Sequence, residues 1–414
     1  MTSIDIEATL SEEEHSILET VHKFAEEVMR PAGTALDALA DPQDVIAKDS
    51  ILWGVFEKHA QLGFDAIADP ESGFTPVQQA RLRSIIGEEM GWGDSGLAIS
   101  FGVNGFPRNL ALLSGNPELL ERYARPGLIG CWAITEPDHG SDQIRFAAGP
   151  KVEHLGRPNC IATKDGDSYV IQGQKAAWVS NGTIADAAAL FCAVDRGQGV
   201  GGVGGFLVPL DDPAVTRGKP LDKIGQRALN QGEIFFDGLR VPAANLVVPP
   251  EGYALFGDVG LSQANSGMGS VFVGLAQAAL DLALSYAKER IQGGVPIFEH
   301  QSVKARLFEM FRKVEAARAL NRRVVQFNAT NPPKLQYAIA SKVTSTNTAF
   351  EVASAALQIF GGNGLSREYP VEKLLRDARA SMIEDGCNDM LGLEAAARLL
   401  ARGRAPGMKG NTQR

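Results

Sequence analysis

The hydrophobic pattern of this 414-residue chain changes its period twice, and this change constrains the fold more than any other feature. Ser11 and Glu14 form a capping-box pattern, in which a serine oxygen and a glutamate satisfy backbone N–H groups at a helix start. The apolar residues behind this pair recur at helical spacing: Ile17, Val21, Phe24 and Val28. Residues 78–90 and 117–124 also have a helical pattern, so we expect the first third of the chain to be helical.

From about residue 128 to residue 248 the pattern is typical of strands. This stretch is rich in Gly and contains short β-branched runs. The turn sequence KDGD at residues 164–167 separates residues 161–163 from 169–171, which predicts a hairpin. Residues 206–209 and 234–237 predict further strands. No helical pattern stands between these strands, so we expect a small antiparallel β domain and not an alternating βαβ sheet.

Helical spacing returns after about residue 249. One apolar stripe covers residues 271–286, and a second begins at Leu335 and continues to Phe360. Long apolar helices of this kind indicate a bundle. The predicted fold class is therefore α+β multidomain, with an N-terminal helical domain over 1–127, a middle antiparallel β domain over 128–248 and a C-terminal helical bundle over 249–414.

Composition and charge exclude several classes of protein. Apolar residues make up 44% and charged residues 21%, as in ordinary globular proteins, and the net charge is -9. An acidic balance argues against non-specific binding to nucleic acid or to a membrane surface. The acidic N-terminus lacks the apolar region of a signal peptide, and no run of 18 apolar residues predicts a membrane span, so we expect a cytoplasmic protein. The four cysteines and six histidines show no metal-ligand spacing, so no metal site is expected.

A glycine motif at residues 197–202 (GQGVGG) fits the GxGxxG pattern of dinucleotide-binding proteins. That interpretation requires a helix after the motif, whereas residues 206–209 are strand-like. We therefore expect a flexible hairpin tip. P-loop, HExxH and GxSxG motifs do not occur in the sequence.

Four sequence segments contain the residues that indicate a chemical function. Residues 132–142 read WAITEPDHGSD and residues 169–182 read YVIQGQKAAWVSNG. The third segment begins GQR at residue 225 and ends FFDGLRVP at residue 242, and the fourth runs from QIFGGNG at residue 358 to Arg376-Asp377. In order and approximate separation these segments resemble those of the acyl-CoA dehydrogenase family. The resemblance covers nearly the whole chain and implies a helical–β–helical fold with FAD as cofactor.

The resemblance also implies which residues bind FAD. In the first segment Trp132, Ala133 and Thr135 would contact the flavin ring, and Ser141 would face the cofactor or the substrate. In the second, Trp178 would lie against the flavin and Ser180 would donate a hydrogen bond near N5. The family shares its FAD between subunits, and the residues implied for a neighbour's site are Arg290, Gln301, Gln358, Gly361 and Gly362. Gly293 departs from the family, which has a Phe there.

The position of the catalytic base is where this sequence departs from the family in an informative way. Counting from Arg376-Asp377, the family's base, a Glu, falls on Asp385, while Glu384, Gly386 and Cys387 flank it. Here Glu384 replaces a Tyr and remains a second candidate for the base, Gly386 is implied on the substrate side, and Cys387 replaces a Thr near FAD. An earlier helix carries the base in some branches, but the matching residues here are Ala264 and Asn265.

The Asp side chain is shorter than Glu by roughly 1.5 Å, one carbon–carbon bond. It can act as a base where burial raises its pKa, and a close Glu384 carboxylate would raise it further. The alternative is that Asp385 is a solvated turn residue beside Gly386.

The leading hypothesis is FAD-dependent α,β-dehydrogenation of an acyl-CoA thioester. A carboxylate would take the α-proton and flavin N5 the β-hydride, in a homotetramer or dimer that passes electrons to electron-transfer flavoprotein. Three alternatives stay open: a flavin oxidase or monooxygenase on the same fold, a redox-neutral acyl-CoA elimination, and a non-catalytic subunit of a hetero-oligomer. Residues 150–164 form an extra loop that either contacts CoA or extends a turn.

Overall fold

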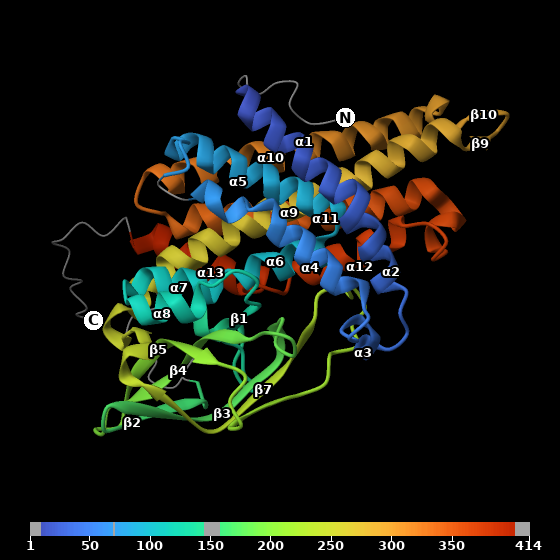
Figure 1. Cartoon of the computed structure of the whole chain (residues 1–414). Coiled ribbons are helices and arrows are strands. Elements are labelled where there is room, and N and C mark those ends of the chain that lie inside the picture. Colours follow the sequence, from blue (N-terminus) through green and yellow to red (C-terminus); the bar gives the residue numbers. More distant parts are fainter. Residues whose placement is uncertain (1–9, 69–70, 145–157, 402–414) are drawn as a thin grey trace, which may run out of the picture.

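The computed structural model describes residues 10–68, 71–144 and 158–401. Helices from both ends of the chain form one body, and the sheet lies against one side of it (Figure 1). Most of the extra loop expected at 150–164 lies outside the described residues. The observed order is helical, β, helical, which confirms the predicted fold class.

The N-terminal region is helical as predicted. Its capping box is present: the Glu14 N–H donates to Ser11 Oγ at 3.2 Å, and the Ser11 N–H donates to Glu14 Oε2 at 2.8 Å. A π-helical turn, Ala25–Met29, joins the first two helices. The α-helices of this region are α1 (Glu12–Phe24), α2 (Arg30–Asp37), α3 (Pro42–Val45), α4 (Ile51–Leu62), α5 (Pro76–Gly93), α6 (Ser95–Asn104), α7 (Phe106–Ser114) and α8 (Pro117–Tyr123).

The middle region forms an eight-stranded sheet in the order β6-β7-β3-β2-β4-β5-β8, with β1 also paired to β4. Its strands are β1 (Gly130–Ala133), β2 (Ile161–Asp165), β3 (Ser168–Ser180), β4 (Ala187–Asp195), β5 (Val200–Pro209), β6 (Val215–Arg217), β7 (Gln231–Pro242) and β8 (Leu246–Val248). The predicted β2–β3 hairpin is confirmed, and the glycine motif 197–202 joins β4 to β5 in a second hairpin. Gly197 and Gly199 adopt φ of 92° and 87°, which glycine reaches without strain.

The sheet is mixed, which differs from the purely antiparallel domain expected. β1 pairs in parallel with one end of β4, and β2 pairs in parallel with the other. Parallel neighbours need long connections, and here the whole β2–β3 hairpin lies between β1 and β4. Turn sequences mark hairpins only, so they gave no sign of these two pairings.

The C-terminal region contains α9 (Tyr253–Glu289), α10 (Gln301–Thr330), α11 (Leu335–Phe360), α12 (Val371–Ser381) and α13 (Asn388–Ala401). The two predicted stripes lie on α9 and α11, and a short hairpin of β9 (Ile291–Gln292) and β10 (Val295–Pro296) follows α9. Among the described residues one helical stretch, Pro250–Glu289, is long and apolar enough to cross a membrane, and 72% of its apolar window is buried in the protein. That burial is expected of the central helix of a bundle.

One hydrophobic core joins the two helical regions. Phe24 and Leu97 from the N-terminal helices share it with Phe272 of α9 and Val352 of α11. The sheet has a second core on one face, and its other face packs against α7 and α8. Strand β4 is buried on both faces, which explains its unbroken apolar sequence. The domain boundaries at 127 and 248 remain a prediction.

Candidate active site

The turn between α12 and α13 carries the two candidate carboxylates, Glu384 and Asp385. Asp385 adopts a φ of 51° and Gly386 a φ of 90°. Asp tolerates the left-handed region better than most residues, and glycine enters it freely. A Cβ on Gly386 would lie 2.7 Å from Ile144 Cδ1, so the close packing also requires glycine here. The chain therefore folds sharply at the position where the sequence predicted the base.

Side chains from three elements hold this turn. Lys342 of α11 donates from Nζ to the Gly386 carbonyl at 3.0 Å, and Asn265 of α9 donates from Nδ2 to the Asp385 carbonyl at 3.3 Å. Ser141, at the start of a 3-10 turn after β1, accepts from the Cys387 N–H at 3.0 Å. These contacts bring together Ser141, Asp385, Gly386 and Cys387, which the sequence placed in one site.

The two carboxylates differ in their partners. Glu384 Oε1 accepts from Gln226 Nε2 at 2.6 Å, whereas the Asp385 carboxylate has no hydrogen-bond donor among the described residues. Burial raises the pKa of Glu384 to about 7, and the negative charge of Asp385 adds to the shift. Burial also raises the pKa of Asp385, although the Lys342 ammonium opposes the shift. Asp385 is therefore a half-buried carboxylate with a raised pKa, not a fully solvated turn residue.

Lys342 supplies the positive charge near this turn without forming an ion pair. Its Nζ donates to the Asn388 Oδ1 at 2.9 Å in addition to the Gly386 carbonyl. Burial lowers its pKa to about 8, against the attraction of Asp385 and Glu384. The lysine thus orients the backbone of the turn and leaves the Asp385 oxygens unengaged.

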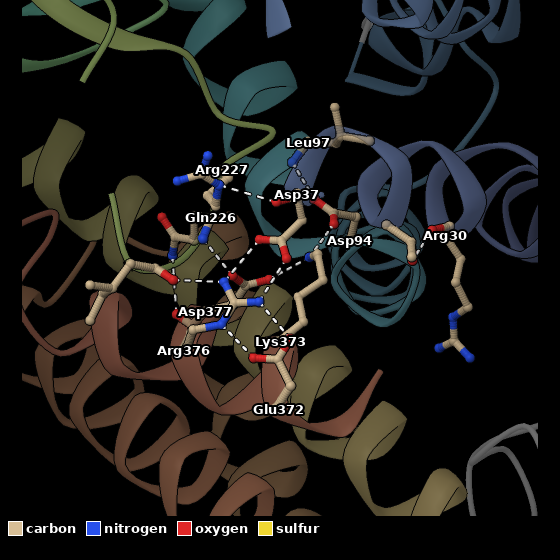
Figure 2. Close-up of polar contacts among 12 residues, drawn as sticks. Arg30, Asp37, Asp94, Leu97, Gln226, Arg227, Glu372, Lys373, Arg376 and Asp377 are labelled. Carbon is tan, nitrogen blue, oxygen red and sulfur yellow. Dashed lines mark hydrogen bonds and ion pairs between the residues drawn. The ribbon is translucent and has the colours of Figure 1, made fainter. Parts of the chain in front are cut away.

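Gln226 links the turn to a buried ionic cluster, and Figure 2 shows Gln226 beside that cluster. Its backbone, at a φ of 50°, donates to Asp377 Oδ1. Lys373 Nζ lies 2.6 Å from Asp377 Oδ2 and 2.6 Å from Asp94 Oδ2. Gly225, just before Gln226, approaches α12 so closely that a Cβ would lie 2.4 Å from the Arg376 carbonyl. The third and fourth sequence segments therefore meet here and fix the side chain that holds Glu384.

Three family models match the chain in order. They are "Acyl-CoA dehydrogenase, N-terminal domain" over residues 11–129, "Acyl-CoA dehydrogenase, middle domain" over 131–239 and "Acyl-CoA dehydrogenase, C-terminal domain" over 259–400. The chain belongs to the acyl-CoA dehydrogenase family.

Individual relatives agree with this assignment. The chain is similar to the mitochondrial short-chain specific acyl-CoA dehydrogenase of Bos taurus, with 31% identity over 83% of this chain and 82% of the relative. It resembles the structure of butyryl-CoA dehydrogenase from Megasphaera elsdenii, with a TM-score of 0.82 and 26% identity over 95% of this chain and 100% of that one. A chain from a structure named for the electron transferring flavoprotein of Acidaminococcus fermentans matches with a TM-score of 0.81 and 27% identity, over 95% and 100% of the two chains.

One stretch of β3, an interior strand of the sheet, fits the flavin expected in an acyl-CoA dehydrogenase. A bulge in β3 between Lys175 and Val179 shifts the pairing register, and Trp178 within it is 59% exposed. The exposed face of this indole is a flat apolar surface, against which a flavin ring could stack. The Thr135 carbonyl accepts from the Ala176 N–H at 2.9 Å, so the two segments that the sequence resemblance assigns to the flavin lie together beside the bulge.

Trp132 lies differently from its neighbours. Its ring packs 4.5 Å from Phe106 and 6.2 Å from Phe191, centroid to centroid, in an apolar pocket between α7 and α9. The following residue, Ala133, points to the opposite face and is fully buried. The side chain of Trp132 is thus directed into the helical body, and its backbone remains to contact a flavin.

The residues implied for a neighbour's FAD form a second group near the far ends of α9 and α11. Arg290 directly follows α9 and Gln301 begins α10, while Gln358 lies in the last turn of α11 and Gly361 and Gly362 follow that helix; all five are exposed. Tyr286 stacks on Phe360 with ring centroids 4.0 Å apart, which holds the two helix ends together. In Figure 1 this end, marked by β9 and β10, lies away from the sheet. Within one subunit the two groups of FAD residues do not meet.

Sequence reasoning missed two polar residues of the site: Lys342 and Gln226. Lys342 carries the clearest signal, because it lies three residues after Ile339 on the apolar stripe of α11 and is fully buried. A lysine is rarely buried without a functional or structural partner. Gln226 stood within the GQR motif, but its contact with Glu384 spans 158 positions and has no local pattern.

Proposed function

We propose that this protein catalyses FAD-dependent α,β-dehydrogenation of an acyl-CoA thioester. FAD, when bound, would accept the β-hydrogen of the substrate as a hydride. The residues proposed to hold it are Trp132 and Ala133 through their backbone, Thr135, Ser141, Trp178, Ser180 and Cys387. A neighbouring subunit would complete the site with Arg290, Gln301, Gln358, Gly361 and Gly362.

We assign the α-proton abstraction to Asp385, and one observation carries this assignment. Of the two carboxylates of the turn, Glu384 accepts a hydrogen bond from Gln226, whereas neither oxygen of Asp385 has a hydrogen-bond donor among the described residues, in an environment that raises its pKa. A base must be deprotonated and free to accept, and a raised pKa strengthens it. Glu384 is engaged by Gln226 at 2.6 Å, which supports a role beside the base.

The substrate class follows from the same turn. A carboxylate can abstract an α-proton only where a neighbouring group makes that proton acidic, and the thioester carbonyl of an acyl-CoA is such a group. Asn265 replaces the substrate-side Arg of other members, and its Oδ1 is buried without a hydrogen-bond donor in the described part of the chain. An unsatisfied buried amide oxygen favours a ligand that donates a hydrogen bond. We infer that the acyl-CoA presents such a donor near Asn265.

The partner and the assembly belong to the same proposal. Electron-transfer flavoprotein is the proposed acceptor, supported by the likeness to a chain from the Acidaminococcus fermentans structure. A homotetramer or dimer is proposed because the two groups of FAD residues lie apart within one subunit. The cytoplasmic location remains a prediction from the sequence.

An anaerobic screen of acyl-CoAs tests the function. The purified protein, yellow with bound FAD, is mixed with one acyl-CoA at a time, and bleaching of the flavin is followed together with the mass of the product. We expect bleaching and a product two mass units lighter, with no oxygen uptake in air. Rapid oxygen uptake would indicate an oxidase, product without bleaching an elimination, and a protein that fails to bind added FAD a non-catalytic subunit.

A further inference from the structure

A short chain of side chains leads from the interior of the protein to Ser180. Ser180 and Gln231 are directly opposite each other on β3 and β7, and Gln231 Nε2 donates to Ser180 Oγ at 3.1 Å. On its other side, Gln231 Oε1 accepts from Lys223 Nζ at 2.9 Å. Lys223 also donates to the Leu229 carbonyl at 2.7 Å, so its ammonium is fixed by two acceptors.

The direction of these hydrogen bonds is determined by chemistry. A lysine ammonium has donors and no acceptor, so the atom of Gln231 that faces Lys223 must be the carbonyl oxygen Oε1. The amide nitrogen of Gln231 therefore faces Ser180 and donates to it. Ser180 Oγ accepts at that contact, and its own proton is left to point elsewhere.

The hydroxyl proton of Ser180 has no acceptor among the described residues of the chain. The backbone beyond Ser180 is also fixed: Asn181 has a φ of 62°, is fully buried, and its N–H donates to the Asn230 carbonyl at 2.7 Å. The serine is thus held in place by backbone and side chain together, with one unused donor.

We propose that Gln231, held by Lys223, is a positioning residue that directs the Ser180 hydroxyl proton toward the flavin. The inference rests on the proposed function, because it takes Ser180 as the residue beside the flavin. Without the donor of Gln231, no side-chain contact of the described residues would fix the rotation of the hydroxyl. With Gln231 in this orientation, donation toward the flavin edge is the one use of the proton that remains within the described site.

The isosteric variant Gln231→Glu tests this orientation. It replaces the donor facing Ser180 with a second acceptor oxygen and keeps the contact to Lys223, so the Ser180 proton turns away from the flavin. Loss of one neutral hydrogen bond should weaken FAD binding to the apoprotein by about 2- to 10-fold and shift the visible absorption bands of bound FAD. Gln172→Leu is the matched control, because Gln172 bridges the same two strands to Asp237 on an exposed stretch.

A double-mutant cycle separates orientation from charge. FAD affinity is measured for the wild type, Ser180→Ala, Gln231→Glu and the double variant. If Gln231 acts through Ser180, the Gln231→Glu penalty is smaller in the Ser180→Ala background than in the wild type. An equal or larger penalty in that background would overturn the inference, since the added charge would then act on the flavin directly.

Lys223→Met provides a second route that adds no negative charge. It frees the Gln231 amide to rotate, and we expect weaker FAD binding that is likewise reduced in the Ser180→Ala background. If Ser180→Ala binds FAD as the wild type does, with the same spectrum, the inference fails. The bleaching screen on wild-type protein tests the proposed function independently, so the two failures are distinguishable.

Discussion

Two buried lysines of the C-terminal region, Lys373 and Lys342, each lie near two carboxylates. Only Lys373 forms ion pairs with its carboxylates. Lys373 contacts both Asp94 and Asp377 at 2.6 Å, and the two charges outweigh burial and raise its pKa (Figure 2). Lys342 contacts a carbonyl and an amide oxygen instead, and burial lowers its pKa to about 8. In the first arrangement two carboxylates share one ammonium, which joins the N-cap of α6 to α12. The second leaves the Asp385 carboxylate without an ion-pair partner, as its proposed role as a base requires.

The largest effect is expected where the carboxylate is unpaired. Asp385→Asn removes the proposed base without a change of shape, so acyl-CoA should reduce the flavin about 10²- to 10⁴-fold more slowly while FAD stays bound. Stopped-flow bleaching under anaerobic conditions measures this rate. Glu384→Gln is the matched control and should keep most of the activity; if it loses more than Asp385→Asn, the two roles are exchanged.

Disruption of the ion pairs around Lys373 should lower the stability of the protein and leave the rate of flavin reduction largely unchanged. Asp94→Ala leaves Lys373 with one partner and removes the N-cap contact from the Leu97 N–H to Asp94 Oδ1 at 2.8 Å. Breaking a buried ion pair typically costs about 3–5 kcal/mol of folding free energy. Denaturant unfolding of the FAD-bound protein measures it. Lys342→Met should lower the free energy of unfolding by less than Asp94→Ala, because no carboxylate contacts that lysine. An equal loss of stability in the two variants would contradict the comparison.

The strained turn should show an intermediate effect. Gly386→Ala places a Cβ at a φ of 90° and 2.7 Å from Ile144 Cδ1, which should cost about 1–3 kcal/mol of stability. Gly392→Ala is the control: it lies in α13 with no atom within 4 Å of the added Cβ, and should stabilise the helix by about 0.5–1 kcal/mol. Thermal unfolding distinguishes the two, and equal melting temperatures would mean that the turn is not constrained.

The smallest effect concerns pH. A protonated Asp385 cannot accept the α-proton, so the bleaching rate should rise with pH as Asp385 ionises. Because burial raises the pKa of Asp385, this rise should occur at a higher pH than the ordinary ionisation of an Asp. The ionisation of Glu384, with its pKa near 7, should add a second and smaller step. In Glu384→Gln the step near pH 7 should disappear while the lower limb remains. A profile unchanged by this substitution would assign that step to another group.

Local patterns predicted the fold well. The capping box at Ser11, the KDGD turn and the helical stripes act over a few residues, so the sequence displays them directly. The same holds for the glycine motif at 197–202, which the strand-like residues after it marked as a hairpin. The parallel pairing of β1 and β2 with β4 depends on long connections and could not be predicted from turns.

The candidate site was predicted only in part for the same reason. The resemblance located Asp385 and Glu384, and the structure shows that their turn adopts the sharp backbone that Gly386 allows. The contacts that distinguish the two carboxylates come from Gln226, Asn265 and Lys342, which are far away in sequence. No spacing rule could have predicted that one carboxylate is engaged and the other free.

Helix α9 has a consequence for mixtures of subunits. Its 37 residues extend about 55 Å, at roughly 1.5 Å per residue. Asn265 on this helix lies beside Asp385, the proposed base of its own subunit, while Arg290 at its end is proposed to reach the FAD of a neighbour. In a dimer of an Asp385→Asn subunit and an Arg290→Ala subunit, one site would carry both lesions and the other would carry neither. Two inactive proteins, co-expressed, should therefore complement each other.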